Sequence, residues 1–504
     1  MKALAARSLM VQGTASHVGK SVLVAALCRI LAQDGYRVAP FKAQNMALNS
    51  FVTPEGGEIG RAQAMQAQAA RVVPSVLMNP ILLKPTNETD AQVIVLGRPT
   101  GTSSAAAYGV EQIPALRRVV RQAYERLAAE HEVVVIEGAG SPAEVNLRNR
   151  DLVNMPVAEI ANAPVLLVGD IDKGGVFAAL VGTLELLEPA ERDRVAGFVI
   201  NKFRGDKTLL APGLDFLAAR TGKRVFGVIP FRRDLRLPEE DALPDRLKPG
   251  RGETNGGHLR IGVIAIPHLS NFTDFDPFAA EPGVTLTYVQ HPQEITEIDC
   301  VILPGSKSTV ADLAYVRERG LADAITGAVA EGKVVIGICG GYQMLGTFIA
   351  DPDHVESEGE QVKGLGLLPV TTRFTRDKIT HQVRARCQRS GDEVTGYEIH
   401  HGVAFPEDGT QPAFEIIERS GQVVRNPDGA RDVSGRIWGS NIHGLFENAS
   451  FRHRFLKELW EAKGLPCPVG IQDWNLDREF DRMADLVRTH LDMVAIYQLL
   501  EGEK

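Results

Sequence analysis

The sequence has few cysteines and no excess of positive charge. Its 504 residues include five widely spaced cysteines, Cys28, Cys300, Cys339, Cys387 and Cys467, and no Cys-x-x-Cys pair. An odd, sparse set predicts neither a disulfide framework nor a zinc knuckle, and it favours a reducing compartment. The formal net charge is −8, which gives no electrostatic reason to expect nucleic acid or an anionic membrane as a partner.

Long apolar runs are also missing. No run approaches the roughly 18–20 residues that a membrane-spanning helix needs. Two positive charges stand among the first seven residues, but Gln12 and Gly13 interrupt the apolar stretch behind them, so we expect no signal peptide. With 44% hydrophobic and 23% charged residues, the composition is typical of a folded globular protein. We therefore expect a cytoplasmic protein with no membrane partner.

The length predicts more than one domain, because a single hydrophobic core stops growing near roughly 250–300 residues. A seam rich in proline and glycine covers residues 236–258 and is typical of an exposed linker. Short apolar runs and helical patterns alternate on both sides of this seam, at 133–136, 164–168 and 197–200 before it and at 261–266, 300–303 and 334–338 after it. This alternation predicts two doubly wound α/β domains.

The predicted boundaries are an N-terminal domain at 1–235, a linker at 236–258, a second domain at 259–450 and a helical extension at 451–504. Helical patterns cover residues 115–129 and 313–331. In the extension, apolar residues recur at helical spacing from Phe480 to Val494, which predicts one amphipathic helix packed on the body. A helix that binds a partner would show the same pattern.

Residues 13–21 (GTASHVGKS) lie between a strand pattern and a helical pattern at 22–33. A phosphate-binding loop requires this context, because backbone N–H groups and the helix N-terminus then surround the phosphate oxygens. Lys20 would neutralise phosphate charge, and the Ser21 hydroxyl would ligate Mg²⁺. The first glycine comes one residue earlier than in the common Gly-x4-Gly-Lys-Ser pattern. A simple glycine turn with an exposed lysine is the alternative interpretation.

An acidic residue should complete the metal site at a neighbouring strand end. Glu137 fits, because it ends an apolar strand pattern and precedes a glycine turn, although it could be an ordinary turn carboxylate. Asn201 follows another strand pattern and could bond a base edge or simply form a turn. The expected ATP-binding residues are Gly13, Thr14, Val18, Gly19, Lys20, Ser21 and Asn201, and the expected metal ligands are Ser21 and Glu137.

A nucleophile is predicted in the second domain, where residues 337–343 (GICGGYQ) follow a strand pattern. Glycines around Cys339 allow a sharp strand-to-helix turn, and the helix N-terminus favours the thiolate. The N–H of Gly340 and the strand-end turn at Gly305 could stabilise an oxyanion. His443 is the expected base, with His400 and His401 as competitors.

The two halves resemble known enzymes. The spacing of residues 13–21, with residues 41–42 (FK) and 137–140 (EGAG), resembles the dethiobiotin synthetase group, which uses ATP to activate a carboxylate. Residues 337–343, residues 304–306 (PGS) and His443 resemble class I glutamine amidotransferase domains. Together they resemble the cobyrinic acid amidating enzymes. Among these, they look like the cobyric acid synthase family at residues 42–49, 57–63, 79–85, 169–178 and 396–400.

This resemblance implies a division of labour. Cys339 would attack the side-chain amide of L-glutamine while His443 moves the proton, and ammonia would travel along a shielded path. In the N-terminal domain, ATP and Mg²⁺ would phosphorylate a corrin carboxylate near Lys42, and ammonia would displace the phosphate. The implied substrate is adenosylcobyrinic acid a,c-diamide, amidated at its b, d, e and g carboxylates to adenosylcobyric acid in adenosylcobalamin biosynthesis. Glu58 is a second candidate for the metal.

One departure concerns the group that orients His443. Most class I domains carry a glutamate two residues after the histidine, but here that residue is Leu445. Glu398 or a backbone carbonyl would have to replace it, or the site would work as a Cys–His dyad. The corrin could contact Lys42 and three further cations, Arg61, Lys84 and Lys173, if these are not ordinary surface charges.

Three other functions stay open on the sequence alone. The a,c-diamide synthase has similar domains but amidates different carboxylates, and the strings near Asn45 and Glu58 argue against it. A partition-type ATPase switch would use the same loop without amidation, and it would not explain Cys339. A scaffold with a dead glutaminase would not turn over glutamine.

Overall fold

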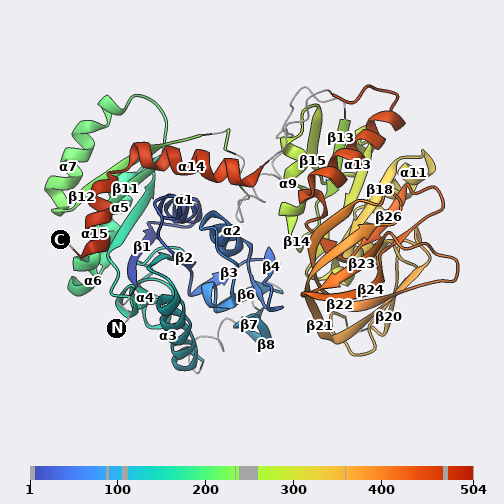
Figure 1. Cartoon of the computed structure of the whole chain (residues 1–504), viewed down its shortest axis with the longest axis horizontal. Helices are drawn as coiled ribbons and strands as arrows, with labels where there is room; N and C mark the ends of the chain where they lie inside the picture. Colours follow the sequence, from blue (N-terminus) through green and yellow to red (C-terminus); the bar gives the residue numbers. More distant parts are fainter. Residues whose placement is uncertain are drawn as a thin grey trace. The chain divides into compact units, whose positions relative to one another are not determined.

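The computed structural model describes residues 6–86, 90–104, 112–232, 234–235, 237, 259–357, 359–468 and 475–502. The chain forms two compact units (Figure 1). Unit 1 comprises Met1–Ala47, Glu58–Glu239 and Asn475–Lys504, and unit 2 comprises Leu48–Gly57 and Glu240–Trp474. Nearly all of the predicted linker lies outside the described residues. None of the described helices is both long and apolar enough to cross a membrane.

Unit 1 is built on a sheet of six parallel strands in the order β12-β11-β10-β1-β9-β2. Its strands are β1 (Arg7–Gly13), β2 (Val38–Phe41), β9 (Val133–Glu137), β10 (Val165–Asp170), β11 (Val195–Phe203) and β12 (Arg224–Pro230). These strands are apolar and buried on both faces, as expected of a parallel sheet covered by helices. Because β1 lies between β9 and β10, the loop that follows it opens at the middle of the carboxyl edge, where ligands of such sheets bind.

Seven helices accompany this sheet in the described part of unit 1 before its C-terminal segment. They are α1 (Lys20–Gln33), α2 (Arg61–Ala69), α3 (Ile113–Glu130), α4 (Met155–Ile160), α5 (Val176–Leu186), α6 (Pro189–Arg194) and α7 (Ala211–Thr221). A separate small sheet contains β3 (Gln44–Met46), β6 (Ile81–Pro85), β7 (Asp90–Val95) and β8 (Arg98–Ser104). The sequence patterns did not predict this second sheet.

The C-terminal segment returns to unit 1 as two helices, where the spacing predicted one. Helix α14 (Leu476–His490) ends before Leu491, and Asp492 starts α15 (Met493–Glu501) by accepting a hydrogen bond from the Ala495 amide at 3.0 Å. Figure 1 shows both in red, with α14 beside α1. Their apolar residues are buried in the same cluster as those of α1, so the packing interpretation is correct for the described residues.

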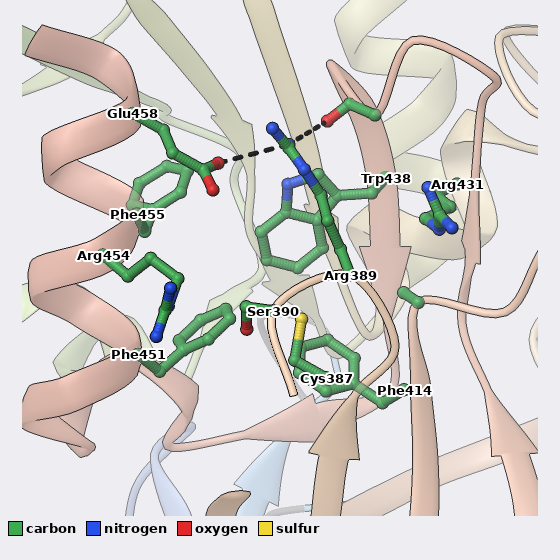
Figure 2. Close-up of a pocket in the computed structure, with 12 residues that line it drawn as sticks. Cys387, Arg389, Ser390, Phe414, Arg431, Trp438, Phe451, Arg454, Phe455 and Glu458 are labelled. Atoms are coloured by element: carbon green, nitrogen blue, oxygen red, sulfur yellow. Dashed lines mark hydrogen bonds and ion pairs between the residues drawn. The ribbon is translucent and has the colours of Figure 1, made fainter. Parts of the chain in front are cut away.

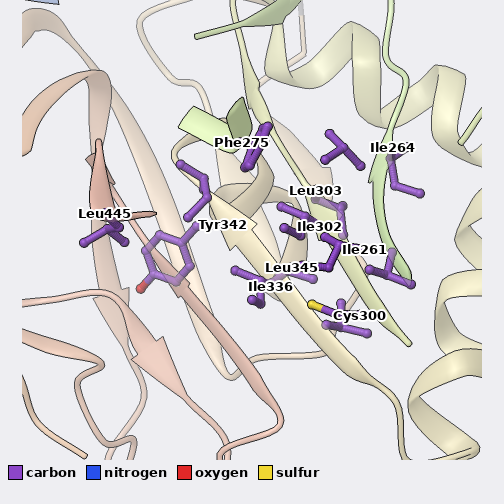
Figure 3. Packing of buried hydrophobic residues seen from close by; sticks show 14 of the residues in the cluster. Ile261, Ile264, Phe275, Cys300, Ile302, Leu303, Ile336, Tyr342, Leu345 and Leu445 are labelled. Atoms are coloured by element: carbon purple, nitrogen blue, oxygen red, sulfur yellow. The ribbon is translucent and has the colours of Figure 1, made fainter. Parts of the chain in front are cut away.

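Unit 2 contains a second six-stranded sheet, ordered β15-β13-β16-β18-β26-β25 and parallel except for β25. Its strands are β13 (Leu259–Ile264), β15 (Val284–Val289), β16 (Cys300–Leu303), β18 (Val334–Ile338), β25 (Ala430–Arg431) and β26 (Ile437–Ser440). Figure 3 shows the apolar core that joins these strands to Tyr342, Leu345 and Phe275. The predicted α/β class is therefore confirmed in both units.

A mixed seven-stranded sheet is the main addition in unit 2. Its long antiparallel pair is β21 (Val370–Cys387) and β22 (Glu393–Pro406), and its other strands are β19 (Phe348–Ala350), β20 (Gln361–Lys363), β23 (Phe414–Arg419), β24 (Gln422–Asp428) and β27 (Ile442–His443). The predicted helix at 313–331 is two helices, α10 (Thr309–Glu318) and α11 (Leu321–Ala330). Gly320 separates them in a left-handed conformation, with φ of 71°.

The remaining helices in the described part of unit 2 are α9 (Asp276–Ala280), α12 (Gly340–Leu345) and α13 (Ala449–Ala462). Short 3-10 turns include η5 (Phe272–Phe275), which follows the small strand β14 (Leu269–Ser270). β14 pairs with β17 (Gly305–Ser306). The predicted extension at 451–504 thus divides between the units, because α13 belongs to unit 2 and α14 and α15 belong to unit 1.

The buried ion pair of α13 leads to a prediction about stability. Arg452 Nε lies 2.6 Å from Glu281 Oε1, and the two side chains are 0% and 1% exposed. Replacing Arg452 with methionine should lower the free energy of unfolding of unit 2 by about 3 kcal/mol, because a buried carboxylate loses its guanidinium. Urea unfolding followed by tryptophan fluorescence measures this change, since all three tryptophans fall within the range of unit 2.

Arg454 provides the matched control on the same helix. It pairs with Asp392 at 2.6 Å, but its side chain is 52% exposed. Arg454→Met should therefore change the free energy of unfolding by less than about 1 kcal/mol. Equal losses in the two variants would mean that burial does not determine the energetic weight of these ion pairs.

Candidate active sites

Cys339 stands at a sharp turn between β18 and α12. Its backbone has φ of 51° and ψ of −111°, a conformation that costs energy in a residue other than glycine and is typical of a functional turn. The turn needs glycine on both sides: a Cβ atom at Gly337 would lie 2.6 Å from the Tyr342 backbone, and one at Gly341 would lie 2.0 Å from the Leu303 carbonyl oxygen. The sequence therefore forces the thiol to the start of the helix.

His443 and Asp274 lie at the same site. The His443 ring is 1% exposed, and its Nδ1 lies 2.6 Å from Asp274 Oδ2. The other carboxylate oxygen accepts a hydrogen bond from the Gly444 amide at 3.1 Å. Asp274 therefore fixes both the ring and the adjacent backbone, which leaves Nε2 of His443 for Cys339.

The charges of this group favour a thiolate and an imidazolium. Burial alone would raise the pKa of the Cys339 thiol, but the hydrogen bond and the charge of His443 outweigh burial and place that pKa below its usual value. Burial would lower the pKa of His443, but the Asp274 carboxylate and Cys339 raise it to about 10. The pair is thus ready for nucleophilic attack at neutral pH.

The residues predicted to stabilise an oxyanion, Gly305 and Gly340, lie near His443 and Cys339. A Cβ atom at Gly305 would lie 3.0 Å from Cε1 of His443, and one at Gly340 would lie 2.9 Å from the Ser306 backbone nitrogen. The Gly340 amide also bonds the Cys339 sulfur and helps to lower its pKa. The Gly305 turn therefore lies beside His443, and the Gly340 amide lies beside the nucleophile.

The other histidines and Glu398 have different partners. Nδ1 of His400 lies 3.0 Å from the Gly402 carbonyl oxygen, and that of His401 lies 3.2 Å from the Thr375 carbonyl oxygen. Glu398 accepts two hydrogen bonds from Arg419, at 2.9 and 3.1 Å, and so does not serve as the orienting acid of His443. Asp274, which the sequence patterns missed, takes that place. The signal available was an acid between two phenylalanines, Phe272 and Phe275.

The phosphate loop of unit 1 joins β1 to α1. Gly19 has φ of 96°, and a Cβ atom there would lie 2.2 Å from Nδ2 of Asn201. Lys20 folds back over the loop and donates to the carbonyl oxygens of Ala15 at 2.9 Å and Gly140 at 3.2 Å. Asn201 donates to the Val18 carbonyl oxygen at 2.9 Å. Its side chain therefore supports the backbone of the phosphate loop.

Glu137, at the end of β9, is the centre of a buried polar cluster. Its Oε1 accepts hydrogen bonds from Ser21 and Lys42, each at 2.8 Å, and its Oε2 accepts one from Gln66. Burial would raise the pKa of Glu137, but the charge of Lys42 and the three hydrogen bonds hold it below its usual value. Glu137 is therefore a carboxylate, in contact with two of the residues that the sequence placed at the ATP site.

These residues fit a nucleotide with a hard divalent cation. Glycine backbone at Gly13 and Gly19 leaves no room for side chains inside the loop. The Ser21 hydroxyl and the Glu137 carboxylate supply the oxygen ligands that Mg²⁺ prefers. In the described part of the chain, no cluster of three or more His, Cys, Asp or Glu residues forms a metal cage.

The other predicted residues of unit 1 are mostly buried. Glu58 forms an ion pair of 2.8 Å with Lys84, with side chains 0% and 5% exposed. Arg61 is also buried, whereas Lys173 is exposed. An ordinary surface position is therefore excluded for Lys42, Arg61 and Lys84.

A hollow in unit 2 lies apart from these groups. Figure 2 shows it between the end of β21 and helix α13, lined by Trp438, Phe451 and Phe455. Two of its guanidinium groups are already paired, Arg389 with Glu458 at 3.2 Å and Arg454 with Asp392 at 2.6 Å. With their charge neutralised, these cations do not make the hollow an anion site.

Comparison with known proteins gives the same division of the chain. Residues 9–244 match the CobQ/CobB/MinD/ParA nucleotide binding domain, and residues 260–451 match the CobB/CobQ-like glutamine amidotransferase domain. A cobyric acid synthase of Moorella thermoacetica is 53% identical over 99% of this chain and 98% of its own length. One from Sorangium cellulosum is 50% identical over 99% of both chains. A solved glutamine amidotransferase aligns with 40% of this chain and 97% of its own, at 18% identity and a TM-score of 0.30.

Proposed function

The chain belongs to the cobyric acid synthase family of glutamine amidotransferase ligases, and from this membership we propose its substrates and the roles of its residues. The acceptor is adenosylcobyrinic acid a,c-diamide, and the product is adenosylcobyric acid, with new amides at the b, d, e and g carboxylates. L-Glutamine supplies the nitrogen, and ATP with Mg²⁺ supplies the activation. The ligase occupies residues 1–235 and the glutaminase residues 259–450, in a cytoplasmic enzyme.

In the glutaminase, the Cys339 thiolate attacks the side-chain carboxamide of glutamine. His443 then gives its Nε2 proton to the departing ammonia, while Asp274 holds the ring and stabilises its charge. The amides of Gly340 and of the Gly305 turn stabilise the oxyanion. Water hydrolyses the resulting thioester, with His443 taking the proton from that water.

In the ligase, the residues of the loop bind and orient the nucleotide. The amides of the loop and the ammonium of Lys20 surround the phosphates, and Ser21 and Glu137 would hold Mg²⁺, which neutralises phosphate charge. Lys42 lies at the same carboxylate and would contact the transferred phosphoryl group or the corrin carboxylate. An acyl phosphate is needed because ammonia does not displace oxide from a free carboxylate, whereas phosphate is a good leaving group.

The observation that carries this proposal is the contact of His443 with both Asp274 and Cys339 in a chain that also holds the phosphate loop. Mass spectrometry of adenosylcobyrinic acid a,c-diamide, incubated with the protein, ATP, Mg²⁺ and glutamine, tests it. A ladder ending at four new amides is expected. Glutamine and ATP turnover with an unchanged corrin would contradict the substrate and leave the chemistry standing.

Asp274 provides a test of the triad. Asp274→Asn should lower glutaminase activity at pH 7 by about 10²-fold, because one preorganised charge is lost from the site. Without this carboxylate the pKa of His443 falls, the thiolate loses support, and the pKa of Cys339 rises. The rate at which iodoacetamide alkylates Cys339 rises with pH as the thiolate forms. In Asp274→Asn this rise should therefore occur at higher pH than in the unaltered protein. An unchanged pH profile would contradict this role.

A further inference from the structure

Ten residues from the N-terminal half of the sequence belong to unit 2. Residues 48–57 are grouped with unit 2, whereas Ala47 before them and Glu58 after them belong to unit 1. The segment contains the short strand β4 (Ser50–Val52) and a turn closed by Thr53, whose amide donates to the Gly57 carbonyl oxygen at 2.8 Å. We call it the 48–57 segment.

The chain on both sides of this segment is fixed at the nucleotide site. Before it, Lys42 donates to Oε1 of Glu137 at 2.8 Å. After it, Gln66 donates to the other oxygen of Glu137 and, at 3.3 Å, to the Ser21 carbonyl oxygen. The ligands proposed for Mg²⁺ are therefore bonded directly to both flanks of the segment.

Asn79 ties the two flanks to each other. Its Nδ2 donates to the Lys42 carbonyl oxygen at 3.1 Å, and its Oδ1 accepts from the Gly60 amide at 3.0 Å. The side chain is 1% exposed. A movement of Lys42 is therefore passed through Asn79 to Gly60, which follows the segment.

The middle of the segment holds the turn that carries Asp274. Asn49 Oδ1 accepts from the Phe272 amide at 3.2 Å, and Asn271 Oδ1 accepts from the Ser50 amide at 2.9 Å. The two asparagines are 1% and 2% exposed, and Asn271 has a left-handed φ of 53°. This reciprocal pair fixes the start of η5, two residues before Asp274.

A second contact of the segment leads to His443 through Tyr397. The Tyr397 hydroxyl donates to the Ser50 carbonyl oxygen at 3.1 Å. The Tyr397 ring stacks on the His443 ring, with centroids 5.3 Å apart and planes 19° apart. The segment is thus bonded to Tyr397 and to the turn that carries Asp274.

We propose that the 48–57 segment couples nucleotide binding at Glu137 to glutamine hydrolysis, through Asn49, Asn271 and Tyr397 as positioning residues. The inference rests on the proposed function. Ser21, Lys42 and Glu137 would hold the nucleotide and its cation, and their positions, once fixed, would fix both flanks of the segment. The middle of the segment then has fewer conformations available. This restriction favours the conformation in which Asp274 contacts His443.

The test compares rates with and without nucleotide. Coupling free energies between two sites correspond typically to 5–150-fold changes, so Mg²⁺ with a non-hydrolysable ATP analogue should raise the glutaminase rate of the unaltered protein at least about fivefold. In Asn49→Ala and Tyr397→Phe, the ratio of the glutaminase rate with nucleotide to the rate without it should fall close to one. Ammonia-driven amidation should stay within about twofold of normal, because the ligase is intact.

Two matched variants separate coupling from general damage. Asn49→Asp keeps an acceptor oxygen for the Phe272 amide and should keep the stimulation. Thr347→Val removes a hydroxyl that donates to Val370 at 3.0 Å elsewhere in unit 2, and it should leave the ratio unchanged. Damage to the fold lowers the rates with and without nucleotide together, so it does not change their ratio.

The alkylation rate of Cys339 by iodoacetamide, measured with and without the same nucleotide, gives the test a second readout. It needs no glutamine turnover, so an absence of glutaminase activity would overturn the proposed function while alkylation still decides the coupling. A nucleotide effect that vanishes in Asn49→Ala supports the inference. No effect in the unaltered protein, or an equal effect in Asn49→Ala, overturns it.

Discussion

Cys339→Ala should lose glutamine-dependent amidation by about 10⁵-fold or more, while amidation driven by added ammonia continues at its normal rate. The loss is this large because no other group can form the thioester, and removal of a nucleophile eliminates the whole covalent route. The ammonia-driven reaction is unaffected because the phosphate loop belongs to unit 1 and Cys339 to unit 2. Mass spectrometry of the corrin with each nitrogen source measures both rates.

Cys467→Ala is the matched control. Cys467 is a free thiol, half-buried, and burial raises its pKa, so it is not an activated nucleophile. This variant should keep both activities. If Cys339→Ala still used glutamine, the assignment of the nucleophile would be wrong; if it also failed with ammonia, the two reactions would not be separable as we propose.

Lys20→Ala should give the opposite pattern. Amidation should fall by about 10³-fold with either nitrogen source, because a preorganised positive charge is lost from the phosphate loop. The basal hydrolysis of glutamine, measured without nucleotide, should persist. ATP consumption and glutamate release, measured in the same sample, separate the two effects.

An exposed lysine in the same unit controls for the change of charge. Lys207 is exposed in a short 3-10 turn, and Lys207→Ala should leave both rates unchanged. Equal losses in both variants would show that the charge of the unit, rather than the position of Lys20, determines the rate.

The sequence allowed prediction of the parts of the site that depend on local chain geometry. Cys339 needs only its glycine neighbours, and Lys20 needs only the loop between a strand and a helix. Asp274 was missed because it meets His443 across 169 residues of sequence, and its local sequence does not reveal that partner. Glu398 was a reasonable alternative, but Arg419 neutralises it.

The fold shows the same limit. Parallel strands such as β9 and β10 were predicted because they are continuous apolar runs, whereas β21 and β22 are long, half-exposed strands without such a run. Gly320 divided a predicted helix because one left-handed residue ends a helix without changing its apolar periodicity. The placement of the 48–57 segment in unit 2 depends on hydrogen bonds of Asn49 and Ser50 with distant residues, which no periodic pattern encodes.

The return of α14 and α15 to unit 1 affects how the protein can be made on the ribosome. The 235 residues from 240 to 474 separate Glu239 from Asn475, and at roughly 5–20 residues per second their synthesis takes on the order of 10–50 s. During that time the apolar side chains that α14 will cover remain without it, so the domain translated first is completed last. Translation pauses and chaperones that bind nascent chains should therefore affect the yield of the nucleotide-binding unit more than that of the amidotransferase unit.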